Sequence, residues 1–154
     1  MRFIALALAL APLVAHAEEP RQAFVSLTIL KDDAVINSQG FVASDEPGFY
    51  SAGNQNNYPN VICGNGTATL RSVAMFSGIT VGHQLTDKGV EVQINRYEVD
   101  SPSVISASIA KCQAAAPSQR LLMNTKEILP LDSLNGRMPL GNGYSLRYET
   151  SSEG

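Results

Sequence analysis

The feature that most constrains the fold is an alternation of apolar and polar positions between Ile79 and Val99. Successive side chains of a β-strand point to opposite faces, so this period of two predicts strands with one core face and one wet face. Asp87-Lys88-Gly89 interrupts the pattern, and its glycine suits the positive φ of a short hairpin connection. The segment therefore predicts an antiparallel hairpin. The alternating apolar residues are Ile79, Val81, Leu85, Val90, Val92 and Ile94.

Similar strand patterns recur along the chain. Ala23–Leu30 alternates and is rich in β-branched residues, and Lys31-Asp32-Asp33-Ala34 supplies a turn before a second strand. Near the C-terminus, Asn135-Gly136 and Asn142-Gly143 are strong turn pairs. Seven to nine short strands predict a mainly β fold, an antiparallel β-sandwich or curled sheet with at most one short helix. The other expected strands are Lys126–Leu131 and Tyr144–Tyr148, and a frayed tail is expected over Ser151–Gly154.

The segment from Ser103 to Cys112 fits both a helix and a strand. Ile105, Ile109 and Cys112 follow helical spacing, and Pro102 suits a helix start. Serine and β-branched residues instead favour an extended conformation. We favour the strand and keep the helix as the alternative.

Residues 45–66 are rich in glycine, proline and asparagine and show no regular period. Long loops in compact domains are often binding loops. Tyrosine offers a rigid apolar face with a polar tip, and amide side chains adapt their hydrogen bonds, so this composition suits protein recognition. We therefore predict a candidate binding loop with ordered ends, where Gly48–Ser51 and Val61–Cys63 could add short strands, and a mobile middle. A solvated connector whose tyrosines pack on the sheet and an exposed strand edge are the alternatives. Its candidate residues are Tyr50, Asn54, Gln55, Asn56, Asn57 and Tyr58.

The first seventeen residues have the pattern of a secretory signal peptide. Arg2 is followed by an apolar run from Phe3 to Val14, and Ala15-His16-Ala17 places small residues at a cleavage site. The run is about twelve residues long, whereas a membrane-spanning helix needs about twenty. We expect cleavage after Ala17, no integral membrane segment afterwards, and one domain over residues 18–154. The expected location is the periplasm or the outside of the cell.

The charge balance argues against a nucleic-acid partner. The whole chain has a net charge of −3, and the mature part keeps fourteen acidic side chains. Affinity for nucleic acids comes largely from Lys and Arg, which here are scattered singly. A protein or a neutral small molecule is the expected partner.

Cys63 and Cys112 are the only cysteines. In an oxidising compartment such a pair is usually joined, so we predict a disulfide that closes a loop of about fifty residues. On the chain-entropy model this bond stabilises the fold by about 4 kcal/mol. Two free thiols are the alternative, and a redox-catalytic pair is not expected because catalytic cysteines normally lie two residues apart.

The sequence offers little catalytic chemistry. His83 is the single histidine outside the leader and lies on the apolar face of the predicted hairpin, where a core imidazole is the ordinary outcome. No zinc ligand set, calcium loop, nucleophile elbow or nucleotide fingerprint occurs. We expect no cofactor, no metal and no catalytic residue. A small hydrolase that uses His83 with a free thiol is the enzymatic alternative, and a carrier of a small apolar ligand is the third class.

Three segments resemble the β-rich core of secretins, the ring-forming outer-membrane channel proteins of secretion and pilus systems. They are Val25–Ile36, Gly78–Ile94 and Pro139–Tyr144, about a quarter of the mature chain. The chain lacks the amphipathic membrane-spanning hairpins and separate periplasmic domains of that family. The resemblance implies an accessory envelope protein with a related sheet. Together with the leader, it leads us to expect an exported binding or assembly module whose partner is an envelope or secretion-apparatus protein.

Overall fold

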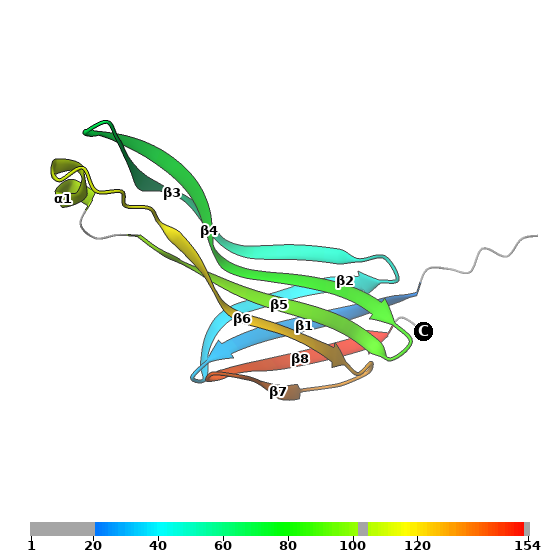
Figure 1. The fold of residues 1–154 in the computed structure, drawn as a ribbon. Helices are drawn as coiled ribbons and strands as arrows, with labels where there is room; N and C mark the ends of the chain where they lie inside the picture. The colour runs from blue at the N-terminus through cyan, green and yellow to red at the C-terminus, as the bar shows by residue number, and fades with distance from the viewer. Residues whose placement is uncertain (1–20, 102–104, 153–154) are drawn as a thin grey trace, which may run out of the picture.

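The computed structural model describes residues 21–101 and 105–152. The predicted leader, residues 1–17, lies outside the described residues. Eight strands and one short helix follow one another along the chain (Figure 1). The prediction of a mainly β fold with at most one short helix is confirmed. The elements are β1 (Gln22–Lys31), β2 (Ala34–Ser44), β3 (Gly48–Gly64), β4 (Thr67–Thr86), β5 (Gly89–Asp100), α1 (Ile105–Ala110), β6 (Ser118–Leu129), β7 (Gly136–Gly141) and β8 (Tyr144–Ser152).

The strands form two four-stranded antiparallel sheets, ordered β2-β1-β8-β7 and β3-β4-β5-β6. Within each sheet, chain neighbours pair with each other, as expected for antiparallel strands joined by short turns. The chain passes from one sheet to the other after β2 and after β6, and β8 then pairs with β1. The fold is thus a meander that returns to its first strand.

The hydrophobic core lies between the two sheets. Alternate residues of β1 and β8 face alternate residues of β4 and β5, which is the period of two seen in the sequence. The predicted hairpin between Ile79 and Val99 is confirmed, with Thr86 paired to Gly89 across its turn. The large apolar side chains that are completely buried are Val25, Leu27, Ile29, Val81, Val90, Val92, Ile94, Leu129 and Leu146.

Two predicted turns are confirmed with the backbone conformation that their residues favour. Asp32 and Asp33, between β1 and β2, have φ of 48° and 65°. Asn142 and Gly143, between β7 and β8, have φ of 50° and 76°. Positive φ at both central residues matches the twist of paired strands, which explains the preference for Asp, Asn and Gly there.

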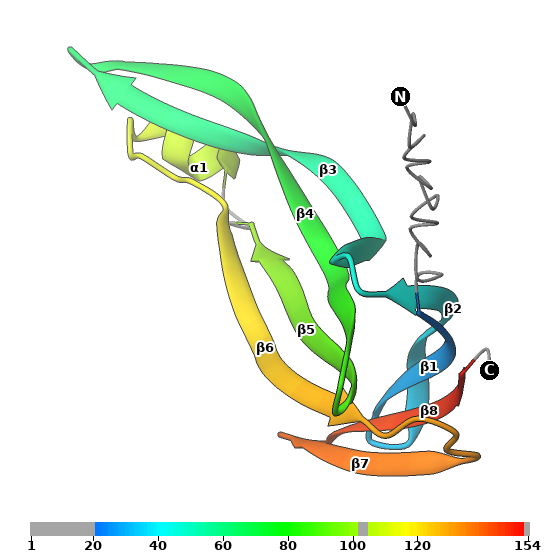
Figure 2. The same cartoon turned by 90° about the vertical axis from the view of Figure 1, so that its right-hand side faces the viewer.

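The β3–β4 hairpin extends beyond the sandwich as a projecting arm (Figure 2). β4 pairs with β5 only from Gly78 onward, whereas it pairs with β3 from Thr67 to His83. We call residues 53–78 the arm. The predicted mobile middle of residues 45–66 is therefore wrong, because Gly48–Gly64 is a continuous strand, whereas the short strands considered at Gly48–Ser51 and Val61–Cys63 are part of it. Asparagine and glycine are poor strand formers on their own, but pairing with β4 overrides that weak local preference.

The arm leaves the sandwich where Gly53 and Gly78 face each other across the hairpin. A Cβ built on either glycine would lie 2.6 Å from the Cα of the other. The two backbones can approach this closely only because neither residue has a side chain.

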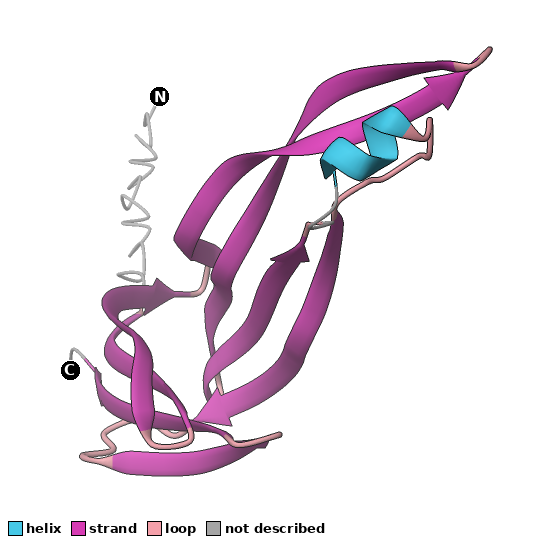
Figure 3. Ribbon diagram, turned by 90° about the vertical axis from the view of Figure 1, so that its left-hand side faces the viewer, coloured by secondary structure: helices cyan, strands magenta, loops and turns pink. Residues whose placement is uncertain are grey.

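α1 lies against the arm, beneath the β3–β4 hairpin (Figure 3). Our preference for a strand over Ser103–Cys112 is therefore wrong for the described part of that segment, and the helical alternative is correct. The described part of the segment takes part in no strand pairing. The first two residues of the segment, 103–104, lie outside the described residues.

The predicted fraying of the C-terminal tail is wrong for Ser151 and Ser152, which belong to β8 and are held to the body. Ser152 donates hydrogen bonds from its backbone N–H and its hydroxyl to Asp132 Oδ1, both 2.9 Å. These bonds stabilise the carboxylate and lower the pKa of Asp132. Buried Thr150 donates its hydroxyl to the carbonyl of Pro130 at 2.6 Å. Residues 153–154 lie outside the described residues.

Candidate functional site

The six residues predicted as a binding loop are divided by the structure into two groups. Tyr50 faces the core side of β3, where its ring centroid lies 5.7 Å from that of Phe41. Its hydroxyl donates a 3.4 Å hydrogen bond to Asn37 Oδ1, and desolvation raises the pKa of Tyr50 to about 12. Tyr50 is therefore a packing residue of the sandwich and not part of an outer surface.

The remaining five residues lie on β3 in the arm. Asn54 to Asn57 are exposed and Tyr58 is half-buried. Because side chains alternate along a strand, Asn54, Asn56 and Tyr58 share one face of the arm, and Gln55 and Asn57 lie on the other. Pairing with β4 holds these side chains in fixed directions, unlike those of a mobile loop.

The arm is almost free of charge. Between Gly53 and Gly78 the only charged residue is Arg71, although 16% of the whole chain is charged. Two large apolar side chains are exposed near its end, Ile62 at 42% and Leu70 at 56%. They lie on opposite faces, because Leu70 pairs with Val61, the residue before Ile62. The stretch without charge is visible in the sequence, and it is the signal from which this surface could have been predicted.

The structure also identifies the strand edges. On β4, the backbone from Thr67 to Ser77 pairs with β3 on one side and has no strand partner on the other within the described residues. One group there is bonded: Gln119 Nε2 donates to the carbonyl of Phe76 at 2.6 Å. On β3, the outer edge is closed at Val61 by two hydrogen bonds with Ala115, of 2.7 and 3.1 Å. The β3 edge of the arm is therefore bridged at Val61, and the β4 edge has no strand partner from Thr67 to Ser77 within the described residues.

Cys63 and Cys112 lie next to each other beside the Val61–Ala115 bridge, although 49 positions separate them in the sequence. The two side chains are hydrogen-bonded thiols, near each other but not at disulfide distance. Desolvation, together with this hydrogen bond, raises the pKa of Cys63 to about 11. A thiol with a raised pKa is a weak nucleophile at neutral pH, so the environment of Cys63 does not activate it.

His83 lies at the opposite end of β3 from Cys63. It pairs with Gly48, the first residue of β3, whereas Cys63 is near the last. At about 3.3 Å per residue, roughly 50 Å of strand separates them. The structure does not bring together the Cys–His pair that a thiol hydrolase requires.

The surroundings of His83 are those of a core residue. Its ring stacks on Phe41 with centroids 4.2 Å apart, and it covers Gly48, where a Cβ would collide with the ring. Nδ1 is buried and has no hydrogen-bond partner among the described residues. Burial lowers the pKa of His83, because the charged imidazolium is poorly solvated there.

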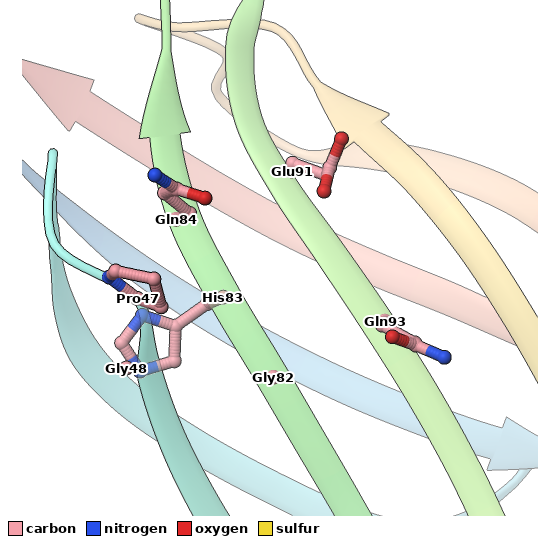
Figure 4. A pocket seen from close by; sticks show the side chains of 7 residues that line it. All are labelled: Pro47, Gly48, Gly82, His83, Gln84, Glu91 and Gln93. Atoms are coloured by element: carbon pink, nitrogen blue, oxygen red, sulfur yellow. The ribbon is translucent and has the colours of Figure 1, made fainter.

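A pocket opens beside His83 on the outer side of the β3-β4-β5-β6 sheet (Figure 4). It lies over Gly82, where an added Cβ would meet nothing within 4 Å. Its polar groups are already engaged: Glu91 pairs with Lys126 at 2.7 Å, and Gln84 donates to the carbonyl of Asp45 at 2.8 Å. One paired carboxylate does not provide the two facing acids that glycoside hydrolysis uses. The lining residues are Pro47, Gly48, Gly82, His83, Gln84, Glu91 and Gln93.

The buried imidazole predicts a pH dependence of stability. Because the pKa of His83 is lower in the folded than in the unfolded protein, its contribution to stability is present above about pH 6.5 and is lost as pH falls. We expect the midpoint of urea unfolding to fall between pH 7 and pH 5.5. In the His83→Phe variant, which keeps a ring against Phe41, this part of the decrease should disappear. A proton NMR titration that places the pKa of His83 above 6.5 contradicts the prediction.

No group of three or more His, Cys, Asp or Glu side chains in residues 21–101 and 105–152 is arranged to hold a metal ion. Within the same residues, no helix has the length and apolar character needed to cross a bilayer. Comparisons with protein-family models, curated proteins and solved structures found no match.

Proposed function

We propose that this protein is an exported, non-enzymatic binding module that engages another protein of the bacterial envelope or of a secretion apparatus. The observation that carries the proposal is the projecting arm, which has a single charged residue, exposes Ile62 and Leu70 to solvent and contributes nothing to the core of the sandwich. The signal-peptide pattern of residues 1–17 supports export to the periplasm or the outside. The resemblance to secretins supports a secretion-apparatus partner.

The chemistry of the arm fits a protein partner. Charged residues are depleted at the centre of protein interfaces, and aromatic and adaptable amide side chains suit recognition. The arm has this composition, with a single arginine, Arg71, and the amides of Asn54 to Asn57. A nucleic acid or an anionic lipid surface would instead favour clustered basic residues.

The open edge of β4 gives the interaction a defined form. Unpaired N–H and C=O groups from Thr67 to Ser77 can pair with an extended segment of another protein, as in strand addition. Backbone pairing then supplies affinity, and the side chains on the two faces of the arm supply specificity. The partner is therefore proposed to contribute a strand or an extended peptide.

A photo-cross-linking amino acid placed at Ile62 or Leu70 tests the proposal in cells that export the protein. We expect one common cross-linked partner from the arm, identified by mass spectrometry, and none from the same group placed at Leu134. Leu134 is a matched control, because it is 82% exposed but lies on the body. With the purified partner, Ile62→Ser or Leu70→Ser should weaken binding by about tenfold, which corresponds to loss of one buried contact.

Two outcomes of these cross-linking and binding experiments contradict the proposal. If Leu134→Ser weakens binding as much as the arm variants, the arm is not the interface. If the arm positions give no partner that the body position lacks, the proposed role of the arm is wrong.

A further inference from the structure

We infer that Cys63 and Cys112 form a redox-controlled cross-link between the arm and the α1 segment, residues 105–117. The bond holds this segment on the arm and makes the arm more ordered. The sandwich folds independently of the bond. The effect of the cross-link on partner binding rests on the proposed function; its effect on the arm does not. The inference differs from a general staple of the fold, because it confines the effect of the bond to one part of the molecule.

The first support is the position of the two thiols beside a backbone bridge. Val61 and Ala115 exchange two hydrogen bonds, and Val61 is 1% exposed. Cys63 follows Val61 by two residues and therefore lies on the same face of β3. Cys112 precedes Ala115 by three residues and contacts Cys63 as a thiol. The bridge thus holds the two sulfur atoms close to each other before any bond forms.

The second support is the backbone conformation of Cys112. Gln113 N–H donates to the carbonyl of Ser108 at 2.8 Å, and Cys112 N–H donates to that of Ile109 at 3.2 Å. This pair of bonds is the Schellman motif that ends many helices, and its left-handed residue is usually glycine. Here that residue is Cys112, with φ of 49°. A side chain occupies a backbone position that disfavours one, and its thiol lies against Cys63.

The third support is the separation of the arm from the core. No residue of 53–78 or 108–117 belongs to the buried core cluster of the sandwich. Within the described residues, the contacts of α1 run to β3 and β4. The α1 segment can therefore separate from the arm without exposing the sandwich core, so a bond between them acts on local opening.

The redox step is a thiol–disulfide exchange with a small disulfide, such as oxidised glutathione. One protein thiol loses its proton and attacks the disulfide, which forms a mixed disulfide and releases one glutathione thiolate. The second protein thiol then loses its proton and attacks the protein sulfur of that mixed disulfide, which forms the Cys63–Cys112 bond and releases the second thiolate. The protein is oxidised by two electrons, and the two glutathione thiolates take up the two protons.

Amide hydrogen exchange on the full-chain protein, purified after export and poised with oxidised or reduced glutathione, tests the inference. Mass mapping should show the Cys63–Cys112 bond in the oxidised sample. Upon reduction, the protection of amides in α1 and in the arm should fall by about tenfold, the size expected when a local constraint is removed. Any fall in the protection of β1 and β8, which reports global unfolding, should be smaller than the fall in α1 and in the arm.

Two variants serve as controls. Cys112→Gly suits the positive φ and removes the thiol, so its exchange pattern should be the same in both redox conditions. Cys63→Ser should behave likewise, without a change in the helix end. Failure of the bond to form with oxidised glutathione, equal protection of the arm in both states, or an equal loss in β1 and β8 overturns the inference. Exchange needs no partner, so failure of arm-mediated binding overturns only the proposed function.

Discussion

Replacing Leu146 with alanine is expected to lower the free energy of unfolding by about 3–5 kcal/mol, the cost of a large-to-small change in a packed core. Leu146 is completely buried on β8, where it pairs with Ile29 on one side and Met138 on the other. Neighbouring strands on both sides prevent the backbone from closing the cavity. Because a domain of this size is stable by about 5–15 kcal/mol, the variant should approach the limit of folding at 37 °C.

Urea unfolding followed by tyrosine fluorescence measures this effect, since the chain has five tyrosines and no tryptophan. Leu134→Ala is the matched control, because the same side chain is 82% exposed there. Its change should stay within about 0.5 kcal/mol. Equal losses for the two leucines are incompatible with a core between the two sheets.

Gly78→Ala is the second large effect, and we expect a loss of about 3 kcal/mol that is concentrated in the arm. Gly78 has a φ of 155°, which side-chain-bearing residues rarely adopt, and a Cβ there would lie 2.6 Å from the Cα of Gly53 and 2.8 Å from the Phe76 ring. Strain and overpacking each cost about 1–3 kcal/mol. The two strands must separate at this point, which disrupts the pairing that carries the arm.

Gly82→Ala on the same strand is the control for this change. An added Cβ at Gly82 meets nothing within 4 Å, and its φ is not in the left-handed region. Alanine reduces the entropy of the unfolded chain, so this variant should be neutral or stabilised by about 0.4–1 kcal/mol. Amide exchange should show faster opening of residues 53–78 in Gly78→Ala alone. Uniform loss of protection across both variants contradicts the role of the Gly53–Gly78 contact.

The wrong expectations about the fold share one cause. Asn54 to Asn57 have low strand propensity, and Ser103 to Cys112 carried a mixed signal, so local reasoning assigned a loop to the first and preferred a strand for the second. Pairing with β4 overrode the low strand propensity of the first segment, whereas the described part of the second segment forms α1 and packs against β3 and β4. Ser151 and Ser152 were also expected to fray on local grounds. In the structure, the backbone N–H of Ser152 donates a hydrogen bond to Asp132.

The candidate site was predicted only in part. The sequence pointed to Asn54–Tyr58, which lie on the arm, but it also included Tyr50, which packs against Phe41. Alternation along β3 places Tyr50 inward only if β3 is a strand at that point. Ile62 and Leu70 were missed, and an exposed strand edge was predicted as an alternative without being located, because exposure depends on what covers a residue and not on its own chemistry.

The amino-acid sequence by itself determined the antiparallel β class, its short turns and the inward face of β1, β4, β5 and β8. These properties are local, since a period of two and turn residues such as Asn142-Gly143 act over a few neighbouring positions. Only the tertiary structure decided that β3 and β4 continue as an arm and that the segment after α1 bridges its β3 edge at Val61. Those outcomes depend on pairing between distant segments, which no local pattern encodes.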